Sequence, residues 1–184
     1  LQTMLLREAQ RRLDGRVEVD DAYLGGERPG KRGRGAASKT PFVAAIQTNS
    51  EGKPLYIRLT PVAGFTYEAL KQWSAECLSS TARVVSDGLG CFGAVTHTAA
   101  QHERHIVGSG KFAVQRAEFR WVNTLLGNLK TAFSGTYHAF NHAKYAQRYL
   151  AEFSYRFNRR FDLAAMVPRL LRAATGVLEL NNCC

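Results

Sequence analysis

The segment RVEVDDAYLG, Arg16–Gly25, decides the fold of this chain. Val17, Val19 and Ala22 point largely to one side of an extended backbone, against polar residues on the other side. This alternation is typical of a half-buried β-strand. Aspartate is depleted within strands, yet Asp20 lies near the centre of this one. The segment therefore predicts a strand that carries a carboxylate for a functional reason.

Further short β-rich runs follow the first strand. The stretch 25–35 (GGERPGKRGRG) is glycine-rich and basic, which predicts a loop rather than a packed element. The two runs after it are joined by a short turn, so we expect three antiparallel strands in succession. The predicted strands after the first cover residues 40–47, 54–60, 82–86 and 104–107.

Periodic apolar residues predict helices over the rest of the chain. Thr66 is a good N-cap, and Gly135 is expected to end a later helix. The predicted helices cover residues 1–14, 66–80, a brief helix that carries Cys91 and Phe92, 118–133, 138–159 and 163–174. Three strands followed by strands that alternate with helices indicate an α/β protein with a mixed sheet covered by helices. This order matches the ribonuclease H-like fold, with a mixed five-stranded sheet and extra C-terminal helices.

The chain is predicted to divide into three regions. The chain begins at Leu1 in helix-like sequence, so residues 1–15 are expected to be the end of an N-terminal helical region. Residues 16–160 form the predicted ribonuclease H-like catalytic domain, and residues 161–184 a C-terminal helix and tail.

The composition indicates a globular protein with an excess of positive charge. Of 184 residues, 45% are hydrophobic, and 25 Lys and Arg against 15 Asp and Glu give a formal net charge of +10. Such an excess favours a polyanionic partner, nucleic acid before an anionic membrane. No apolar run approaches the ~20 residues of a membrane span. The four cysteines form no CxxC pair, which argues against a zinc ribbon and fits a reducing, cytoplasmic compartment.

Two aspartates are candidates for a metal site. Phosphodiester chemistry commonly uses two Mg²⁺ ions roughly 4 Å apart, held by carboxylates on rigid elements. A ribonuclease H-like site places one Asp on the first strand and one at the end of the fourth, and Asp20 and Asp87 occupy these places. The alternatives are a solvated Asp on an open strand face and an ordinary turn Asp before Gly88.

A third ligand should come from a helix beside these strands. Asn123 and Lys130 are seven residues apart, so they project from one face of the helix predicted over 118–133. The Asn amide oxygen is an acceptable hard ligand for Mg²⁺, and the Lys ammonium can reach DNA beside the metals. Asn128 competes with Asn123 but faces a different direction on the helix. From spacing alone, a helix-terminal Asn and an exposed Lys remain the simpler interpretation.

Several multi-residue segments together resemble a known family. VEVDDAYLGG, VVSDGLGCF, FRWVNTLLGNLKTAFSGTYHAF and KYAQRYLAEFSYRFNRRF resemble the catalytic region of DDE-superfamily transposases of bacterial insertion sequences. The similarity spans residues 5–175 and is strongest to the ISXO-type subgroup, whose third acid is commonly Asn with Lys seven residues on. Asp21 stands where relatives often carry Glu. The N-terminal zinc-ribbon or helical DNA-binding region expected of a full-length relative is not part of this sequence.

The resemblance implies a site and a reaction. Asp20, Asp87 and Asn123 would form the catalytic set and bind two Mg²⁺ or Mn²⁺ ions, with Lys130 as the downstream basic residue. The expected function is DNA strand cleavage followed by strand transfer, which moves an insertion sequence. The expected partners are double-stranded DNA, at the element ends and the target, and further copies of the chain assembled on it. The expected location is the bacterial cytoplasm, at the nucleoid.

Basic residues supply candidate DNA contacts, because each phosphate neutralised releases a counterion. They lie in the glycine-rich loop and in the long late helix, and they are Arg28, Lys31, Arg32, Arg34, Arg148, Arg156, Arg159 and Arg160. Two alternative functions stay open at this point. One is a decayed or domesticated DNA-binding protein of the same fold without catalysis, and the other is a ribonuclease H-like nuclease.

Overall fold

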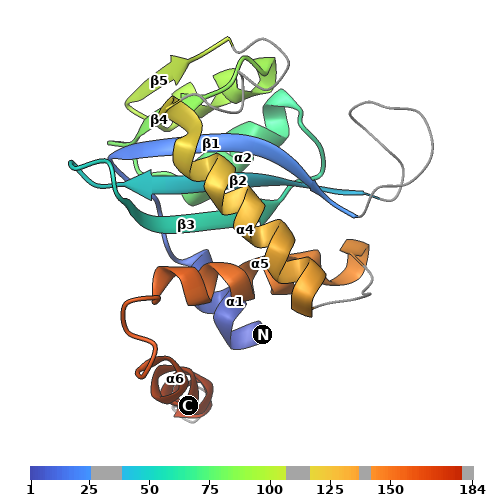
Figure 1. Ribbon diagram of the computed structural model, residues 1–184, viewed down its shortest axis with the longest axis vertical. Coiled ribbons are helices and arrows are strands. Elements are labelled where there is room, and N and C mark those ends of the chain that lie inside the picture. Colours follow the sequence, from blue (N-terminus) through green and yellow to red (C-terminus); the bar gives the residue numbers. More distant parts are fainter. Residues whose placement is uncertain (26–38, 107–116, 137–141, 180–184) are drawn as a thin grey trace.

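The protein is built on one mixed five-stranded sheet (Figure 1), seen in a computed structural model that describes residues 1–25, 39–106, 117–136 and 142–179. The strands are β1 (Arg16–Leu24), β2 (Thr40–Thr48), β3 (Pro54–Pro61), β4 (Arg83–Ser86) and β5 (Gln101–Arg104). Their order across the sheet is β3-β2-β1-β4-β5. The first three strands are antiparallel to one another, whereas β4 is parallel to β1 and β5 is parallel to β4. This is the predicted ribonuclease H-like arrangement, with β1 at its centre.

Helices cover both faces of this sheet. The α-helices are α1 (Gln2–Ala9), α2 (Tyr67–Cys77), α4 (Arg120–Thr136), α5 (His142–Asn158) and α6 (Met166–Glu179). Two 3₁₀-helices, η1 (Gly90–His97) and η2 (Ala117–Phe119), complete the described elements. Within the described ranges, no helix has both the length and the apolar character that crossing a membrane requires.

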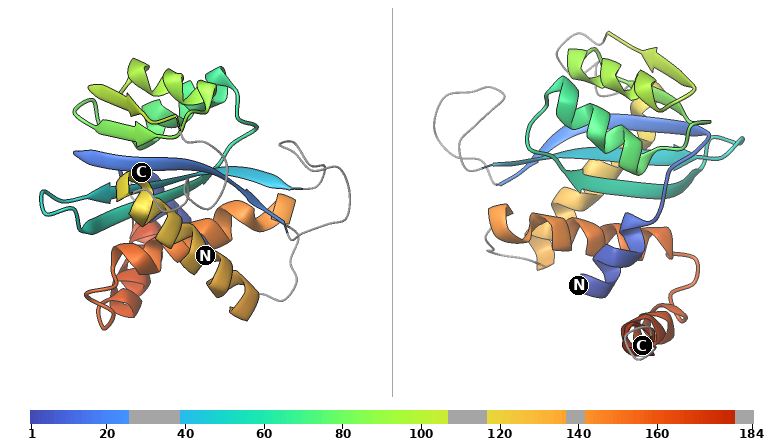
Figure 2. Two further views of the ribbon diagram at one scale, coloured as in Figure 1. Left: turned by 45° about the horizontal axis from the view of Figure 1, so that its top comes forward. Right: turned by 180° about the vertical axis from the view of Figure 1, so that it is seen from behind.

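One face of the sheet packs against α2 and η1, as the view from behind in Figure 2 shows. Val17 and Val19 point to this side of β1 and are fully buried, together with Trp73 of α2 and Phe92 of η1. The helix α2 begins where the sequence predicts, because the Thr66 side chain accepts a hydrogen bond from the Ala69 amide. Alternation along β1 therefore supplies half of the core.

The other face packs against α4 and α5 (Figure 1). Leu125 and Leu129 of α4 and Leu150 of α5 are buried against Ile46 of β2 and Val85 of β4. Apolar residues at three- and four-residue spacing form this stripe on α4, which is why the helix lies flat across the sheet. The opposite flanks of α4 are left to polar residues.

The edge strand β3 is closed by side chains from α5. Asn158 accepts a hydrogen bond from the Ile57 amide (2.7 Å) and donates to the Ile57 carbonyl (3.0 Å), so its amide group replaces a neighbouring strand. Asn158 also donates to Glu8 of α1 (2.6 Å), which is 6% exposed. These contacts join α1, α5 and the sheet into one unit, and α6 packs beyond them on α1.

Two predicted elements differ from the structure. The strand predicted at 104–107 lies three residues earlier, at Gln101–Arg104, where it pairs with β4 at the sheet edge. The helix predicted over 1–14 ends at Ala9, because Leu13 is buried and extended. The Leu13 amide donates to the Cys77 carbonyl, and its carbonyl accepts from the Ser79 amide. Gly15 then turns the chain into β1 with a positive φ of 60°.

The predicted late helices are present with shifted ends. The structure begins α4 at Arg120 after η2 and continues it through Gly135 to Thr136. The helix predicted over 163–174 begins later and extends further, as α6. The predicted division of the chain into three regions stays a prediction.

Candidate active site

Parallel pairing of β1 with β4 brings Asp20 beside Asp87. The last residue pair in this ladder is Val19 with Ser86, so the two aspartates are the next residues along neighbouring parallel strands. Residues in step on parallel strands project to the same face of a sheet. This face is the one that α4 covers, since Val85 two residues earlier on β4 packs with the α4 side chains.

A cluster of three carboxylates results at this position. Asp20, Asp21 and Asp87 each offer one oxygen, and these oxygens lie within 4.8 Å of one another. All three residues are partly exposed. The Asp20 carboxylate also accepts a hydrogen bond from the Asp21 amide (2.9 Å), and the Asp87 carboxylate accepts one from the Leu89 amide (3.0 Å). The two expected aspartates are therefore brought together and held by backbone amides.

Asp21 was given no role by sequence reasoning. On a regular strand, neighbouring side chains point to opposite faces, which separates Asp21 from Asp20. The ladder with β4 ends at Val19, however, so in the described structure β1 pairs only with β2 from Asp20 onward. The only sequence signal for Asp21 was its position next to Asp20 in one strand. That signal could be interpreted only once the position of β4 was known.

The chemistry of this donor set fits a divalent metal. Carboxylate oxygens are hard ligands, which Mg²⁺ and Mn²⁺ prefer over nitrogen or sulfur. Three anionic groups this close repel one another in the absence of a cation, and a bound divalent ion would offset that repulsion. Asp20, Asp21 and Asp87 are the residues that could hold it.

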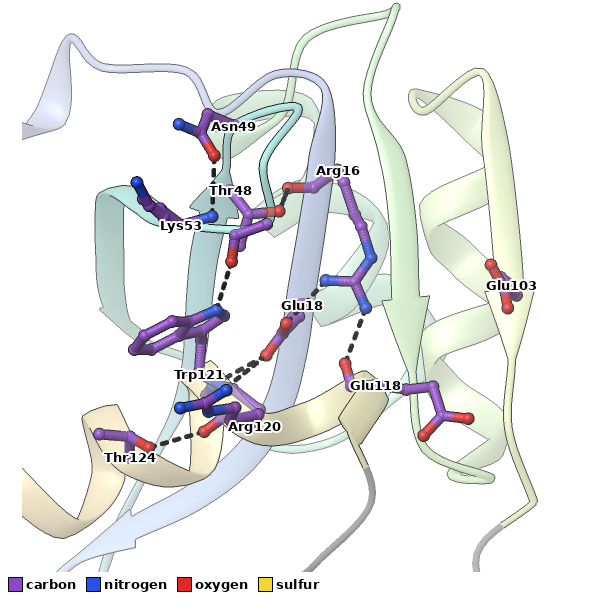
Figure 3. A network of polar contacts seen from close by, with 12 residues as sticks. Arg16, Glu18, Thr48, Asn49, Lys53, Glu103, Glu118, Arg120, Trp121 and Thr124 are labelled. Atoms are coloured by element: carbon purple, nitrogen blue, oxygen red, sulfur yellow. Dashed lines mark hydrogen bonds and ion pairs between the residues drawn. The ribbon is translucent and has the colours of Figure 1, made fainter.

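A buried glutamate fixes the start of α4 beside the cluster (Figure 3). Glu18 lies two residues before Asp20 on β1 and is 1% exposed. One of its carboxylate oxygens accepts hydrogen bonds from the amides of Trp121 (2.9 Å) and Val122 (3.0 Å). These amides belong to the first turn of α4, where they have no partner within the helix. Glu18 thus satisfies them and complements the helix dipole.

Arg16 completes this contact. Its guanidinium donates to the other Glu18 oxygen (2.6 Å) and to the Glu118 carbonyl just before α4 (2.9 Å). The side chain of Arg16 is 30% exposed, so water screens it more than it screens Glu18. Sequence reasoning treated Glu18 only as a polar residue in the β1 alternation, because nothing local indicates that a distant helix will need an acceptor there.

Asn123 follows directly after the residues that Glu18 holds. It is half-buried, whereas Lys130 and Asn128 are exposed. Asn123 and Lys130 share one flank of α4, since seven residues make two helical turns. Asn128 is seven residues after Trp121 and shares the other flank, where the Trp121 indole donates to the Gly52 carbonyl in the β2–β3 turn (2.6 Å). The two asparagines therefore point to opposite sides of the buried stripe.

The two arginines that directly follow α5 contact other parts of the protein. Arg159 pairs with the buried Glu8 (2.5 Å), and Arg160 donates to the carbonyls of Leu55 and Pro54 (3.1 and 2.5 Å). Burial lowers the pKa of the Arg160 guanidinium. Both groups stabilise the packing of α5, and their contact with DNA stays a prediction.

The other predicted DNA contacts are less constrained. Arg156 pairs with Glu152 one helical turn earlier (2.6 Å), and the Arg148 guanidinium lies over the Tyr145 ring, 5.9 Å from its centroid. The predicted contacts Arg28, Lys31, Arg32 and Arg34 lie outside the described residues.

A half-buried histidine supports the strand end next to Asp87. The Ser86 hydroxyl lies 2.8 Å from His102 Nε2 on the neighbouring strand β5, and it also reaches the Asp87 carbonyl (3.1 Å). Burial, with a smaller contribution from Arg104, lowers the pKa of His102. Arg104 itself donates to the Gly88 carbonyl (2.5 Å). These contacts hold the backbone on both sides of Asp87.

A ribonuclease H-like sheet with carboxylates clustered on its first strand and directly after its fourth strand is the arrangement of the DDE superfamily of transposases. Comparison with protein families confirms this class and narrows it. Residues 12–158 match the family model described as the ISXO2-like transposase domain. The chain therefore belongs to the ISXO2-like transposase family of insertion sequences. Neither the curated proteins nor the solved structures contain a significant match to the chain.

Proposed function

We propose that this chain is the catalytic domain of a DNA transposase that cuts the ends of an insertion sequence and joins them to target DNA. The observation that carries the proposal is the carboxylate cluster of Asp20, Asp21 and Asp87, with oxygens within 4.8 Å of one another, in a transposase-family domain. The same face of the sheet supports α4, which carries Asn123 and Lys130.

The proposed reaction has two steps at phosphorus. In the first, a water oxygen attacks the phosphate at the element end, the bond to the 3′ oxygen breaks, and that oxygen leaves as a 3′-hydroxyl. In the second, the 3′-hydroxyl loses its proton and attacks a phosphate of target DNA, and the target's own 3′ oxygen leaves. A divalent metal bound at the cluster supplies charge neutralisation at the phosphate and lowers the pKa of the attacking oxygen.

Each residue has a role in this proposal. Asp20 and Asp87 hold the metal ions, Mg²⁺ or Mn²⁺, and Asp21 adds an oxygen that sequence reasoning did not assign. The Asn123 amide oxygen completes the ligand set from the helix. Lys130 contacts a phosphate of the bound strand as a point charge. Assembly of several copies on paired DNA ends, at the nucleoid in the cytoplasm, belongs to the same proposal.

The test uses the chain with a plasmid that carries both ends of the insertion element encoding it. Cleavage is followed in single turnover across a Mn²⁺ titration, and strand transfer is followed with a labelled 3′-hydroxyl donor. Asp87→Asn should abolish both reactions and weaken Mn²⁺ binding by calorimetry. The matched control is Asp162→Asn, because Asp162 is exposed and its carboxylate pairs with Arg169 on the surface (2.8 Å).

The outcomes separate the candidate functions. Cleavage without strand transfer indicates a ribonuclease H-like nuclease, and DNA binding without cleavage indicates a binding protein of the same fold. Equal activity of Asp87→Asn and Asp162→Asn contradicts the proposed site.

The third ligand is tested on α4 with the two asparagines. Asn123→Ala should reduce cleavage by about 100-fold or more, because one metal loses a ligand and its position shifts. Asn123→Asp should retain more activity than Asn123→Ala, since a carboxylate of the same reach binds Mg²⁺. Asn128→Ala is the control on the other flank and should behave as wild type. Loss of activity in Asn128→Ala with normal Asn123→Ala would move the ligand to Asn128.

A further inference from the structure

A glycine lies in the middle of α4, and no packing contact among the described residues explains it. Gly127 is eight residues into a helix of 17, and glycine is among the least favourable residues in a helix interior. A Cβ atom added at Gly127 would meet nothing within 4 Å. Its φ is not in the left-handed region, so backbone conformation does not require glycine either. Nothing in the packing of the described protein therefore explains this residue.

The position of Gly127 relates it to the candidate site. It comes four residues after Asn123 and three before Lys130, so all three belong to one flank of α4. Both Gly127 and Lys130 are exposed. The helical turn is also well supported, because the Thr131 hydroxyl donates to the Gly127 carbonyl (3.1 Å). The missing side chain thus leaves a bare strip of helix backbone between an amide and an ammonium group.

The charge of α4 favours a polyanion. The helix contains no Asp or Glu, although it contains Arg120 and Lys130. A phosphate between Asn123 and Lys130 would meet no carboxylate contributed by α4 itself. The acids of the carboxylate cluster come from β1 and from the residue after β4 instead.

We propose that Gly127 is a contact residue for the DNA backbone, whose sugar-phosphate chain packs directly against the main chain of α4 at this point. Because glycine has no Cβ, a ligand can approach the backbone more closely at a glycine than at any other residue. The approach places a phosphate beside Lys130. The inference rests on the proposed function for the identity of the ligand as DNA.

The experiment compares glycines at two places on the same helix. Gly127 is replaced by Ala and by the larger Gln, both good helix formers. The matched control is Gly135, near the end of α4, where an added Cβ also meets nothing within 4 Å but the flank is different. Melting temperature, affinity for a short duplex in EDTA by fluorescence anisotropy, and single-turnover cleavage in Mn²⁺ are measured for each variant.

At Gly127, the substitutions should affect stability and DNA affinity in opposite directions. Gly127→Ala should raise the melting temperature by about 2–4 °C, because alanine favours the helix. The same change should weaken duplex binding about tenfold, which corresponds to about 1.4 kcal/mol. Gly127→Gln should weaken binding further, since its side chain is larger. The Gly135 variants should bind within about twofold of wild type while they gain stability.

Three results would overturn the inference. The first is wild-type affinity in both Gly127 variants, and the second is an equal loss of affinity in the Gly135 variants. The third is a lower melting temperature for Gly127→Ala, which would mean that the protein itself fills the space. Because affinity is measured without metal, the comparison remains decisive if the wild type binds DNA but does not cleave it, which is the failure of the proposed function.

Discussion

Removing the Glu18 carboxylate should release the start of α4 from the sheet. The group is 1% exposed and accepts hydrogen bonds from Trp121 and Val122 as well as from Arg16. In Glu18→Ala the Val122 amide stays buried without a partner, which costs about 1–3 kcal/mol. The half-buried Trp121 amide can hydrate, so the loss of this helix-capping bond costs about 1 kcal/mol.

Arg16 adds little to this cost. Its side chain is 30% exposed, and it keeps its hydrogen bond to the Glu118 carbonyl (2.9 Å), so water can replace Glu18 at an estimated cost below about 1 kcal/mol. The expected loss for Glu18→Ala is therefore about 2–4 kcal/mol of unfolding free energy. Glu18→Gln keeps an oxygen for the two amides but turns an NH₂ toward Arg16, and its expected loss is about 1–2 kcal/mol.

The assay combines stability with catalysis. Urea unfolding gives the free energies, with Arg16→Gln as the control that removes the ion pair and keeps the cap. Under the proposed function, a displaced α4 moves Asn123, and Glu18→Ala should lower kcat about 100-fold with little change in the affinity for DNA. Glu18→Gln should recover most of the activity. A loss below about 1 kcal/mol in Glu18→Ala with normal kcat would refute the reasoning.

Two further predictions concern single contacts. Asn158→Ala should cost about 2–4 kcal/mol in urea unfolding, since it removes the closure of β3 at Ile57, and Asn158→Asp should cost more because a second carboxylate would face Glu8. Equal losses in the two variants would contradict the assigned contacts. The lowered pKa of His102 means that the unfolded chain binds a proton more readily, so this residue's contribution to stability is complete above about pH 6.5 and is lost as the pH falls. Wild type should lose more stability than His102→Gln between pH 7.5 and 5.5, and parallel curves would show that His102 does not titrate this way.

Local patterns were sufficient for most of the architecture. The alternation of Val17 and Val19 predicts β1, and the spacing of Leu125 and Leu129 predicts the buried stripe of α4. Both patterns exist because one side of each element faces the core, and that side therefore consists of apolar residues. The proximity of Asp20 and Asp87 can be predicted from the same patterns, once the order of the elements indicates that β1 and β4 are neighbouring parallel strands.

Elements without a buried face have no such apolar pattern, so the sequence does not predict them correctly. The strand β5 reads QHER, with three exposed positions, and only its hydrogen bonds to β4 make it a strand. The strand was predicted at 104–107 instead because that run contains the apolar residue Ile106, although Ile106 is 78% exposed. Leu13 was assigned to a helix because its extended state depends on carbonyl and amide groups of Cys77 and Ser79, more than sixty residues away.

The sequence by itself determined the fold class, the family and the neighbouring positions of Asp20 and Asp87, because these depend on patterns within elements and on the order of the elements. Only the tertiary structure decided the inclusion of Asp21, which requires β4 to end beside it, and the function of Glu18, whose partners are about a hundred residues distant. It is also the source of the proposal for Gly127, since only the packed helix shows that nothing in the described protein occupies the space there. Hydrogen-bond partners and empty space are properties of how elements come together, and no single segment encodes them.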